Sequence, residues 1–166
     1  HGPMSVFADL NGDGTNELIA GRTAFTYSGE VLWSRDDLAD GLSTVANVDS
    51  DPGPEVILLT AANDLLVLEA DGSTLYGPLR LSSGQVNEDG EDEGFISTNP
   101  AVGDLDGDGY PEIVISATNW VYVFEHNLVL KWQAQSSDQT GASGPTTFDF
   151  EGDGRAEVVY ADEGNV

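Results

Sequence analysis

Several residue types are absent or scarce in this chain of 166 residues. Cysteine is missing altogether, which excludes disulfide bonds and thiol chemistry. No apolar run is long enough to form a transmembrane helix, so we expect no membrane insertion. The two histidines are His1 and His126, and without a further base the many serines lack a nucleophilic relay. The composition therefore argues against nucleophilic catalysis.

Positive charge is scarce too. Five basic residues stand against 30 acidic ones, and the formal net charge is −25. Because like charges repel, nucleic acids and anionic membrane surfaces are poor partners for such a chain. The acids are not spread evenly, since fourteen of them fall into four short motifs.

The clearest motif is Asp104-Leu-Asp106-Gly-Asp108-Gly-Tyr110-Pro-Glu112, which an apolar run follows at once. Carboxylates at every second position repel one another unless a cation lies among them. Ca²⁺ takes several oxygen ligands at flexible geometry and is the first candidate. Further copies of the nine-residue motif begin at residues 9, 47 and 149. We call the four copies loop one (9–17), loop two (47–55), loop three (104–112) and loop four (149–157).

Short strand-like segments surround each loop. An apolar or small-residue run precedes each loop, and the first three loops are followed by three such segments, the last two joined by a tight turn. Four-stranded antiparallel units at this period predict an all-β fold of the β-propeller type, with a β-solenoid or a series of β-sandwiches as the alternative. We expect a tag remnant at 1–4 and one domain over 5–166. Its three complete blades span about 5–35, 43–81 and 98–133, and half of a fourth spans 145–166.

An EF-hand also has alternating acids, but it needs a carboxylate at loop position 12, at the start of a helix. Position 12 holds Ala20, Leu58, Ile115 and Tyr160 in the four copies, and none of these can supply a carboxylate. The closing acid lies at position 9 instead, and a strand-like run follows it. The helix–loop–helix alternative is therefore excluded.

The four motifs resemble the calcium-binding repeats of the FG-GAP and VCBS type, found in the propeller of integrin alpha subunits and in many bacterial surface proteins. The resemblance implies three to four Ca²⁺ ions, each between the first two strands of a blade. Positions 1, 3, 5 and 9 would supply side-chain oxygens, and position 7 a backbone carbonyl. Carried over to this sequence, the ligands are Asp9, Asn11, Asp13, Thr15 and Glu17; Asn47, Asp49, Asp51, Gly53 and Glu55; Asp104, Asp106, Asp108, Tyr110 and Glu112; and Asp149, Glu151, Asp153, Arg155 and Glu157.

Two loops depart from the pattern. Loop two has Ser50 and Pro52 where the others have glycine, and proline cannot adopt a positive φ. Loop four has Glu151 in place of a shorter acid or amide. The alternative for any of the loops is a metal-free turn whose side chains cap backbone N–H groups.

These observations predict a calcium-stabilised, non-catalytic scaffold for adhesion or for recognition of a protein or glycan, outside the cell or on its surface. The alternatives are the propeller part of a secreted polysaccharide-degrading enzyme and a structural spacer of a surface protein. Three and a half blades leave open edges, so we expect self-association or the remainder of a longer propeller. The acidic stretch 88–93 is a recognition loop, a further cation site or a disordered insertion.

Overall fold

The computed structural model describes residues 4–82, 88, 98–138 and 143–162. Over these residues the chain forms four antiparallel sheets, three with four strands and one with two. The all-β prediction is confirmed. Nothing in the described part of the chain is a helix of the length and apolarity that crossing a membrane requires. The acidic stretch 88–93 lies outside the described residues except for Glu88.

Each sheet takes its strands in chain order, because every strand pairs with the one that follows it through a short connection. Sheet one contains β1 (Ser5–Ala8), β2 (Glu17–Ala20), β3 (Thr23–Phe25) and β4 (Val31–Ser34). Sheet two contains β5 (Gly41–Ala46), β6 (Glu55–Thr60), β7 (Asp64–Leu68) and β8 (Thr74–Arg80). Sheet three contains β9 (Ala101–Gly103), β10 (Glu112–Ala117), β11 (Trp120–Phe124) and β12 (Leu130–Gln135). Sheet four contains β13 (Thr146–Phe148) and β14 (Glu157–Val159).

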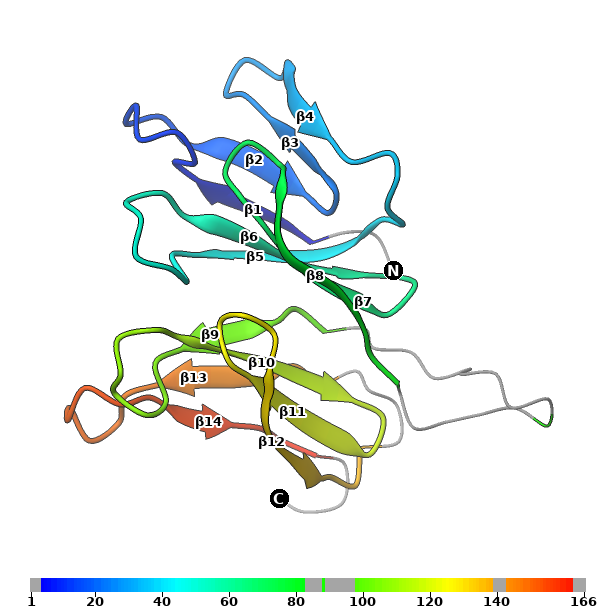
Figure 1. Ribbon diagram of the computed structural model, residues 1–166, viewed down its shortest axis with the longest axis vertical. Helices are drawn as coiled ribbons and strands as arrows, with labels where there is room; N and C mark the ends of the chain where they lie inside the picture. Colours follow the sequence, from blue (N-terminus) through cyan, green and yellow to red (C-terminus); the bar gives the residue numbers. More distant parts are fainter. Residues whose placement is uncertain (1–3, 83–87, 89–97, 139–142, 163–166) are drawn as a thin grey trace.

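The four sheets pack face to face in chain order (Figure 1). Strand β6 shows how the sequence dictates this, because all six of its residues are buried. Side chains of a strand alternate between the two faces of its sheet. Val56 and Leu58 accordingly pack in the cluster shared with sheet one, and Ile57 and Leu59 in the cluster shared with sheet three. A continuous apolar run therefore marks a strand that is covered on both faces.

Specific contacts hold sheet one against sheet two. The indole Nε1 of Trp33 on β4 donates a hydrogen bond of 2.9 Å to the carbonyl of Ala70, in the hairpin between β7 and β8. Gly72 of the same hairpin lies under the indole, and a Cβ at this glycine would come within 2.7 Å of the ring. Arg35 donates to the Gly72 carbonyl at 2.9 Å. The β7–β8 hairpin of sheet two is thus held by β4 of sheet one and by the residue that follows it.

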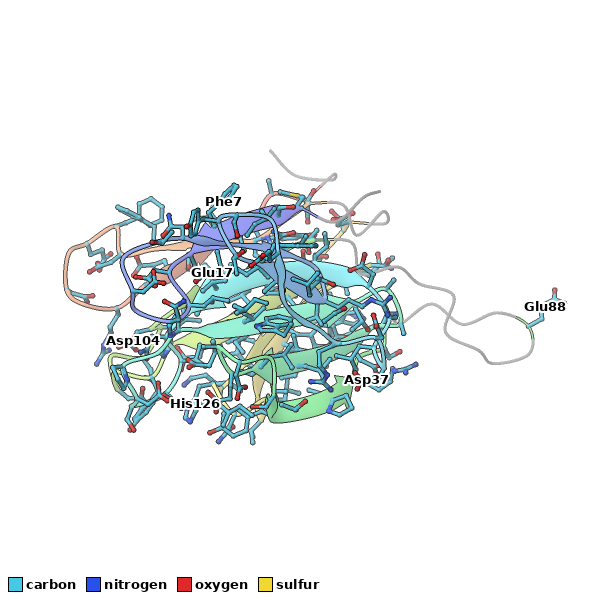
Figure 2. All side chains as sticks on the ribbon, turned by 90° about the horizontal axis from the view of Figure 1, so that it is seen from above. Phe7, Glu17, Asp37, Glu88, Asp104 and His126 are labelled. Atoms are coloured by element: carbon cyan, nitrogen blue, oxygen red, sulfur yellow. The ribbon has the colours of Figure 1, made fainter. Side chains whose placement is uncertain are left out.

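The four acidic loops connect the first two strands of each sheet and lie along one edge of the stack (Figure 1). Figure 2 shows Glu17 and Asp104 toward this edge, and Asp37 and Glu88 of the connections between sheets toward the opposite edge. His126, in the β11–β12 hairpin, stacks on Tyr110 of loop three with ring centroids 4.8 Å apart. The topology therefore gathers the candidate ligands on one side of the molecule.

Candidate metal centres

All four loops share one hydrogen bond made by the closing glutamate. Its Oε2 accepts from the backbone N–H of loop position 2, across seven residues. The four pairs are Glu17 with Leu10 at 2.9 Å, Glu55 with Val48 at 2.6 Å, Glu112 with Leu105 at 2.6 Å, and Glu157 with Phe150 at 3.0 Å. One carboxylate oxygen is thereby committed to the loop's own backbone. The other oxygen, Oε1, takes no part in this bond.

In loops one, three and four, the aspartate at position 1 caps the turn. Asp104 Oδ1 accepts from Gly107 N at 2.7 Å, and its Oδ2 accepts from Gly109 N at 3.0 Å. Both glycines have positive φ, 80° and 90°, which a residue with a Cβ rarely adopts. Asp9 and Asp149 make the same pair of bonds to the glycines of their own loops. The capping alternative is therefore observed at position 1, and it explains why glycine recurs at positions 4 and 6.

Loop two reverses the direction of this cap. Pro52, at position 6, has no N–H to offer, and the position-1 residue is an amide instead of an acid. Asn47 Nδ2 donates to the carbonyls of Asp51 at 2.7 Å and Gly53 at 2.9 Å. The amide of Asn47 and the carbonyl of Gly53, two predicted ligands, are thus bonded to each other. The change from Asp to Asn and the change from Gly to Pro belong to one structural solution.

Loop two nevertheless holds a close group of acids. One carboxylate oxygen from each of Asp49, Asp51 and Glu55 lies within 4.8 Å of the others. Glu55 is only 1% exposed, and its buried Oε1 has no hydrogen-bond donor among the described residues. Burial raises the pKa of the Glu55 carboxyl, and the charges of Asp49 and Asp51 raise it further. The pKa of Glu69, at the end of β7, is also raised by burial and by the same two aspartates. This loop concentrates negative charge around an oxygen that lacks a partner.

Loop three brings the corresponding acids together but also contains a cation. Oxygens of Asp104, Asp106 and Asp108 lie within 4.8 Å of one another. The ammonium of Lys131 on β12 donates to Asp106 Oδ2 at 2.6 Å and to Glu112 Oε1 at 2.9 Å. The Lys131 hydrogen bond lowers the pKa of Asp106, and the bonds to the carboxylates, that to Asp106 foremost, raise the pKa of Lys131.

The remaining predicted ligands lie in loops one and four. In both, as in loops two and three, the N–H of position 7 donates to the position-5 carboxylate, from Thr15 to Asp13 at 2.8 Å and from Arg155 to Asp153 at 3.0 Å. Hydrogen bonds from backbone N–H groups, that of Gly154 foremost, lower the pKa of Asp149. Asn11 and Glu151 are exposed. Within the described ranges, groups of three clustered acids occur in loops two and three and not in loops one and four.

The residues of loop two suit a hard divalent cation. Carboxylate and carbonyl oxygens are the ligands that Ca²⁺ prefers, and Glu55 Oε1 is a buried acceptor to which no described residue donates. Asp49, Asp51 and Glu55 would hold the ion, which would supply the positive charge that this group of carboxylates lacks. Sequence reasoning missed Glu69, Glu125 and Lys131, which lie on or beside later strands. Glu69 and Glu125 hold equivalent positions after the third strands of sheets two and three, so aligning those strands could have found them, whereas Lys131 has no counterpart in sheet two.

Comparisons with known proteins agree with this description. The family of FG-GAP-like repeats matches residues 104–160. No curated protein sequence matches the chain.

Solved structures share the fold. The chain resembles the V. cholerae biofilm matrix protein Bap1 with a TM-score of 0.58 and 24% identity, over 80% of this chain and 20% of that one. It resembles the Bacillus licheniformis rhamnogalacturonan lyase PL11 with a TM-score of 0.65 and 18% identity, over 96% of this chain and 40% of that one. For the rhamnogalacturonan lyase YesW the TM-score is 0.61 and the identity 18%, over 99% and 30%. The chain thus spans at most 40% of the length of these three proteins. The match over residues 104–160 includes loops three and four and confirms the resemblance to FG-GAP repeats for that part of the chain.

Proposed function

We propose that the chain is a calcium-stabilised, non-catalytic β-propeller scaffold of an extracellular or cell-surface protein. The observation that carries this proposal is the unpartnered, buried Oε1 of Glu55 beside Asp49 and Asp51. A buried carboxylate without a partner destabilises a fold, and a bound cation removes that penalty. The scaffold would present its connections between sheets for adhesion or for recognition of a protein or glycan.

Calcium titration of chelator-treated protein tests the proposal. We expect heat of binding by calorimetry and a rise in the melting temperature by circular dichroism, because a ligand that binds the folded state stabilises it. Glu55→Gln keeps an acceptor for the Val48 N–H but loses the charge, so it should reduce both responses. Glu30→Gln, an exposed glutamate outside the loops, is the matched control. The proposal fails if calcium at about 10 mM, roughly tenfold above weak extracellular sites, produces neither response.

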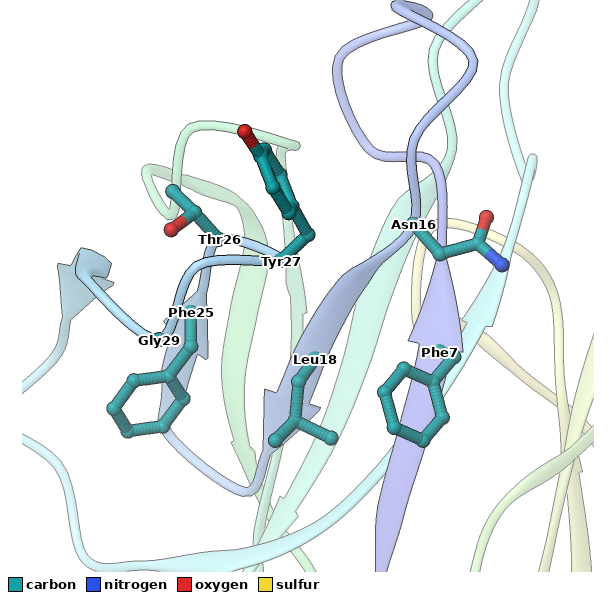
Figure 3. Close-up of a pocket in the computed structure, with 7 residues that line it drawn as sticks. All are labelled: Phe7, Asn16, Leu18, Phe25, Thr26, Tyr27 and Gly29. Carbon is teal, nitrogen blue, oxygen red and sulfur yellow. The ribbon is translucent and has the colours of Figure 1, made fainter.

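The two ends of the stack support a further part of the proposal, that other sheets cover them. On the outer face of sheet one, Phe7 is 66% exposed and lines a pocket with Leu18 and Phe25 (Figure 3). At sheet four, Phe148 and Phe150 are 62% and 61% exposed. We infer that a second copy, or the remainder of a longer propeller, packs on these faces. Light scattering over a range of concentrations tests self-association, and a folded monomer at every concentration would count against a second copy.

The runner-up function is the propeller part of a polysaccharide-degrading enzyme. Two of the similar structures are rhamnogalacturonan lyases, and this likeness at 18% identity concerns the fold. Incubation with rhamnogalacturonan distinguishes the two functions, because cleavage would favour the enzyme and binding without cleavage would favour the recognition scaffold. If neither cleavage nor binding to a panel of glycans and surface proteins is found, the structural spacer is favoured.

A further inference from the structure

Lys131 places an ammonium group among the candidate ligands of loop three. Its three N–H donors are all used, by Asp106 at 2.6 Å, Glu112 at 2.9 Å and Glu125 at 3.0 Å. Glu112 is fully buried, and the oxygen that it offers to Lys131 is Oε1, the one not committed to the backbone. The ammonium therefore occupies the oxygen that a metal ion in this loop would need.

The strand register shows that this lysine is particular to sheet three. Lys131 precedes Trp132, which pairs with Val123, and in sheet two Leu75 precedes Tyr76, which pairs with Val67. Leu75 therefore occupies in sheet two the position that Lys131 occupies in sheet three. The acid at the end of the third strand is common to both sheets, as Glu69 and Glu125. Sheet two thus has the acid but not the lysine, and in the part of the chain that the structure describes no group donates to its Glu55 Oε1.

A second basic residue lies against loop three. The side chain of Arg155, from loop four, approaches Gly107 so closely that a Cβ there would come within 3.1 Å of Arg155 Nε. The N–H of Ala156 also donates to the carbonyl of Asp104 at 2.7 Å. Two of the five basic residues in the chain are therefore gathered at this one loop.

We propose that Lys131 is a built-in competitor for the cation of loop three, so that loop two binds calcium more tightly than loop three. The ammonium lies at Asp106 Oδ2 and Glu112 Oε1, and a divalent ion held by the same carboxylates would be repelled by its positive charge. Calcium must displace the lysine from loop three, whereas in loop two it meets an oxygen without a donor. The inference rests on the proposed function, because it ranks sites that the proposed function assigns to calcium.

The test is a calcium titration of the full chain that follows each loop by NMR. The amide signals of Gly53 and of Gly107 with Gly109 report on loops two and three. In the natural sequence we expect the Gly53 midpoint at a lower calcium concentration than the Gly107 midpoint. Lys131→Leu, which installs the residue found in sheet two, should lower the Gly107 midpoint by at least about tenfold, the effect of one hydrogen bond to a charged group. The Gly53 midpoint should not move.

The converse variant keeps the test decisive if Lys131→Leu does not fold without calcium. Leu75→Lys should raise the Gly53 midpoint by about tenfold and leave that of Gly107 unchanged. Equal midpoints in the natural sequence, or a Gly107 midpoint that Lys131→Leu leaves unchanged or raises, would overturn the competition. If no loop amide responds to calcium in any variant, the proposed function itself fails.

Discussion

The middle of the stack and its two ends are built from the same repeat but differ in burial. Strands β6 and β10, in sheets two and three, are buried along all six residues. In the end sheets, β1 alternates between exposed and partly buried residues, and β13 does the same. The close groups of three acids also occur in the middle, in loops two and three, over the described part of the chain. Dense packing and concentrated negative charge thus coincide, which suggests that the packed middle holds carboxylates together that would otherwise separate.

Core truncation should give the largest difference between middle and ends. Leu59 is 1% exposed between sheets two and three, so Leu59→Ala should lower the free energy of unfolding by about 2–5 kcal/mol. Leu18, on the outer face of sheet one, is only partly buried, and Leu18→Ala should lower it by less than about 2 kcal/mol. Urea unfolding in calcium buffer measures both variants. Equal losses would mean that the end face is covered in solution.

Neutralising the closing glutamate of a loop should have the second largest effect, on the stability gained from calcium. At calcium concentrations about 100-fold above the dissociation constant, a single bound ion adds about 2.7 kcal/mol to the free energy of unfolding. Glu55→Gln should remove most of this gain for loop two. Glu17→Gln changes an equally buried glutamate in loop one, where no close group of three acids forms, and should remove less. Thermal unfolding with calcium and with chelator gives each gain, and a larger effect at Glu17 would contradict the comparison.

The pH dependence of the calcium-free protein should show a smaller effect. The folded-state pKa of Glu55 is raised above its ordinary value of 4.5, so the folded protein binds its proton at a higher pH than the unfolded chain does. Lowering the pH from neutrality toward about 4.5 should therefore stabilise the fold through Glu55. The difference in free energy of unfolding between the natural sequence and Glu55→Gln, measured in chelator, isolates this contribution. A difference that does not change with pH would show that the raised pKa is absent.

In loop three, lowering the pH should have the opposite effect on the free energy of unfolding, through Asp106. The pKa of Asp106 is lowered below its ordinary value of 3.8 by the hydrogen bond from Lys131. The stability that Asp106 contributes is therefore present above pH 3.8 and is lost as the pH falls through its folded-state pKa. Asp106→Asn compared with the natural sequence should show the loss only in that acidic range. Acid titration followed by tryptophan fluorescence measures it.

Substitution of an exposed end-face aromatic should have the smallest effect on stability. Phe7→Ser and Phe148→Ser alter side chains that are 66% and 62% exposed, and each should change the free energy of unfolding by no more than about 0.5 kcal/mol. Both should weaken self-association if a second copy covers these faces. Sedimentation velocity at several concentrations gives the association constant. Val129→Ser, at a side chain that is 60% exposed in the β11–β12 hairpin, provides a control.

Much of the fold could be predicted from the sequence, since it depends on local patterns. The alternating acids, the glycines with positive φ and the apolar runs each specify a turn or a strand without reference to distant residues. For loop two, Pro52 predicts that the ordinary cap is absent, because proline has no N–H to donate. The reversed hydrogen bonds of Asn47 could not be predicted from it. The role of Lys131 could not be found in this way. It depends on the register between β11 and β12, which brings residue 131 beside residue 106.

The bond between the closing glutamate and the N–H of position 2 separates what a repeat must keep from what it can change. Loop two has Asn47, Ser50 and Pro52 where the other loops have an aspartate and two glycines. Lys131 of β12 lies among the acids of loop three, yet both loops have this bond at 2.6 Å. The residues at positions 1, 4 and 6 therefore differ between loops while the glutamate still fastens the end of each loop to its beginning. The bond from the N–H of position 7 to the carboxylate of position 5 is also present in all four loops, so two hydrogen bonds together fix the course of the turn.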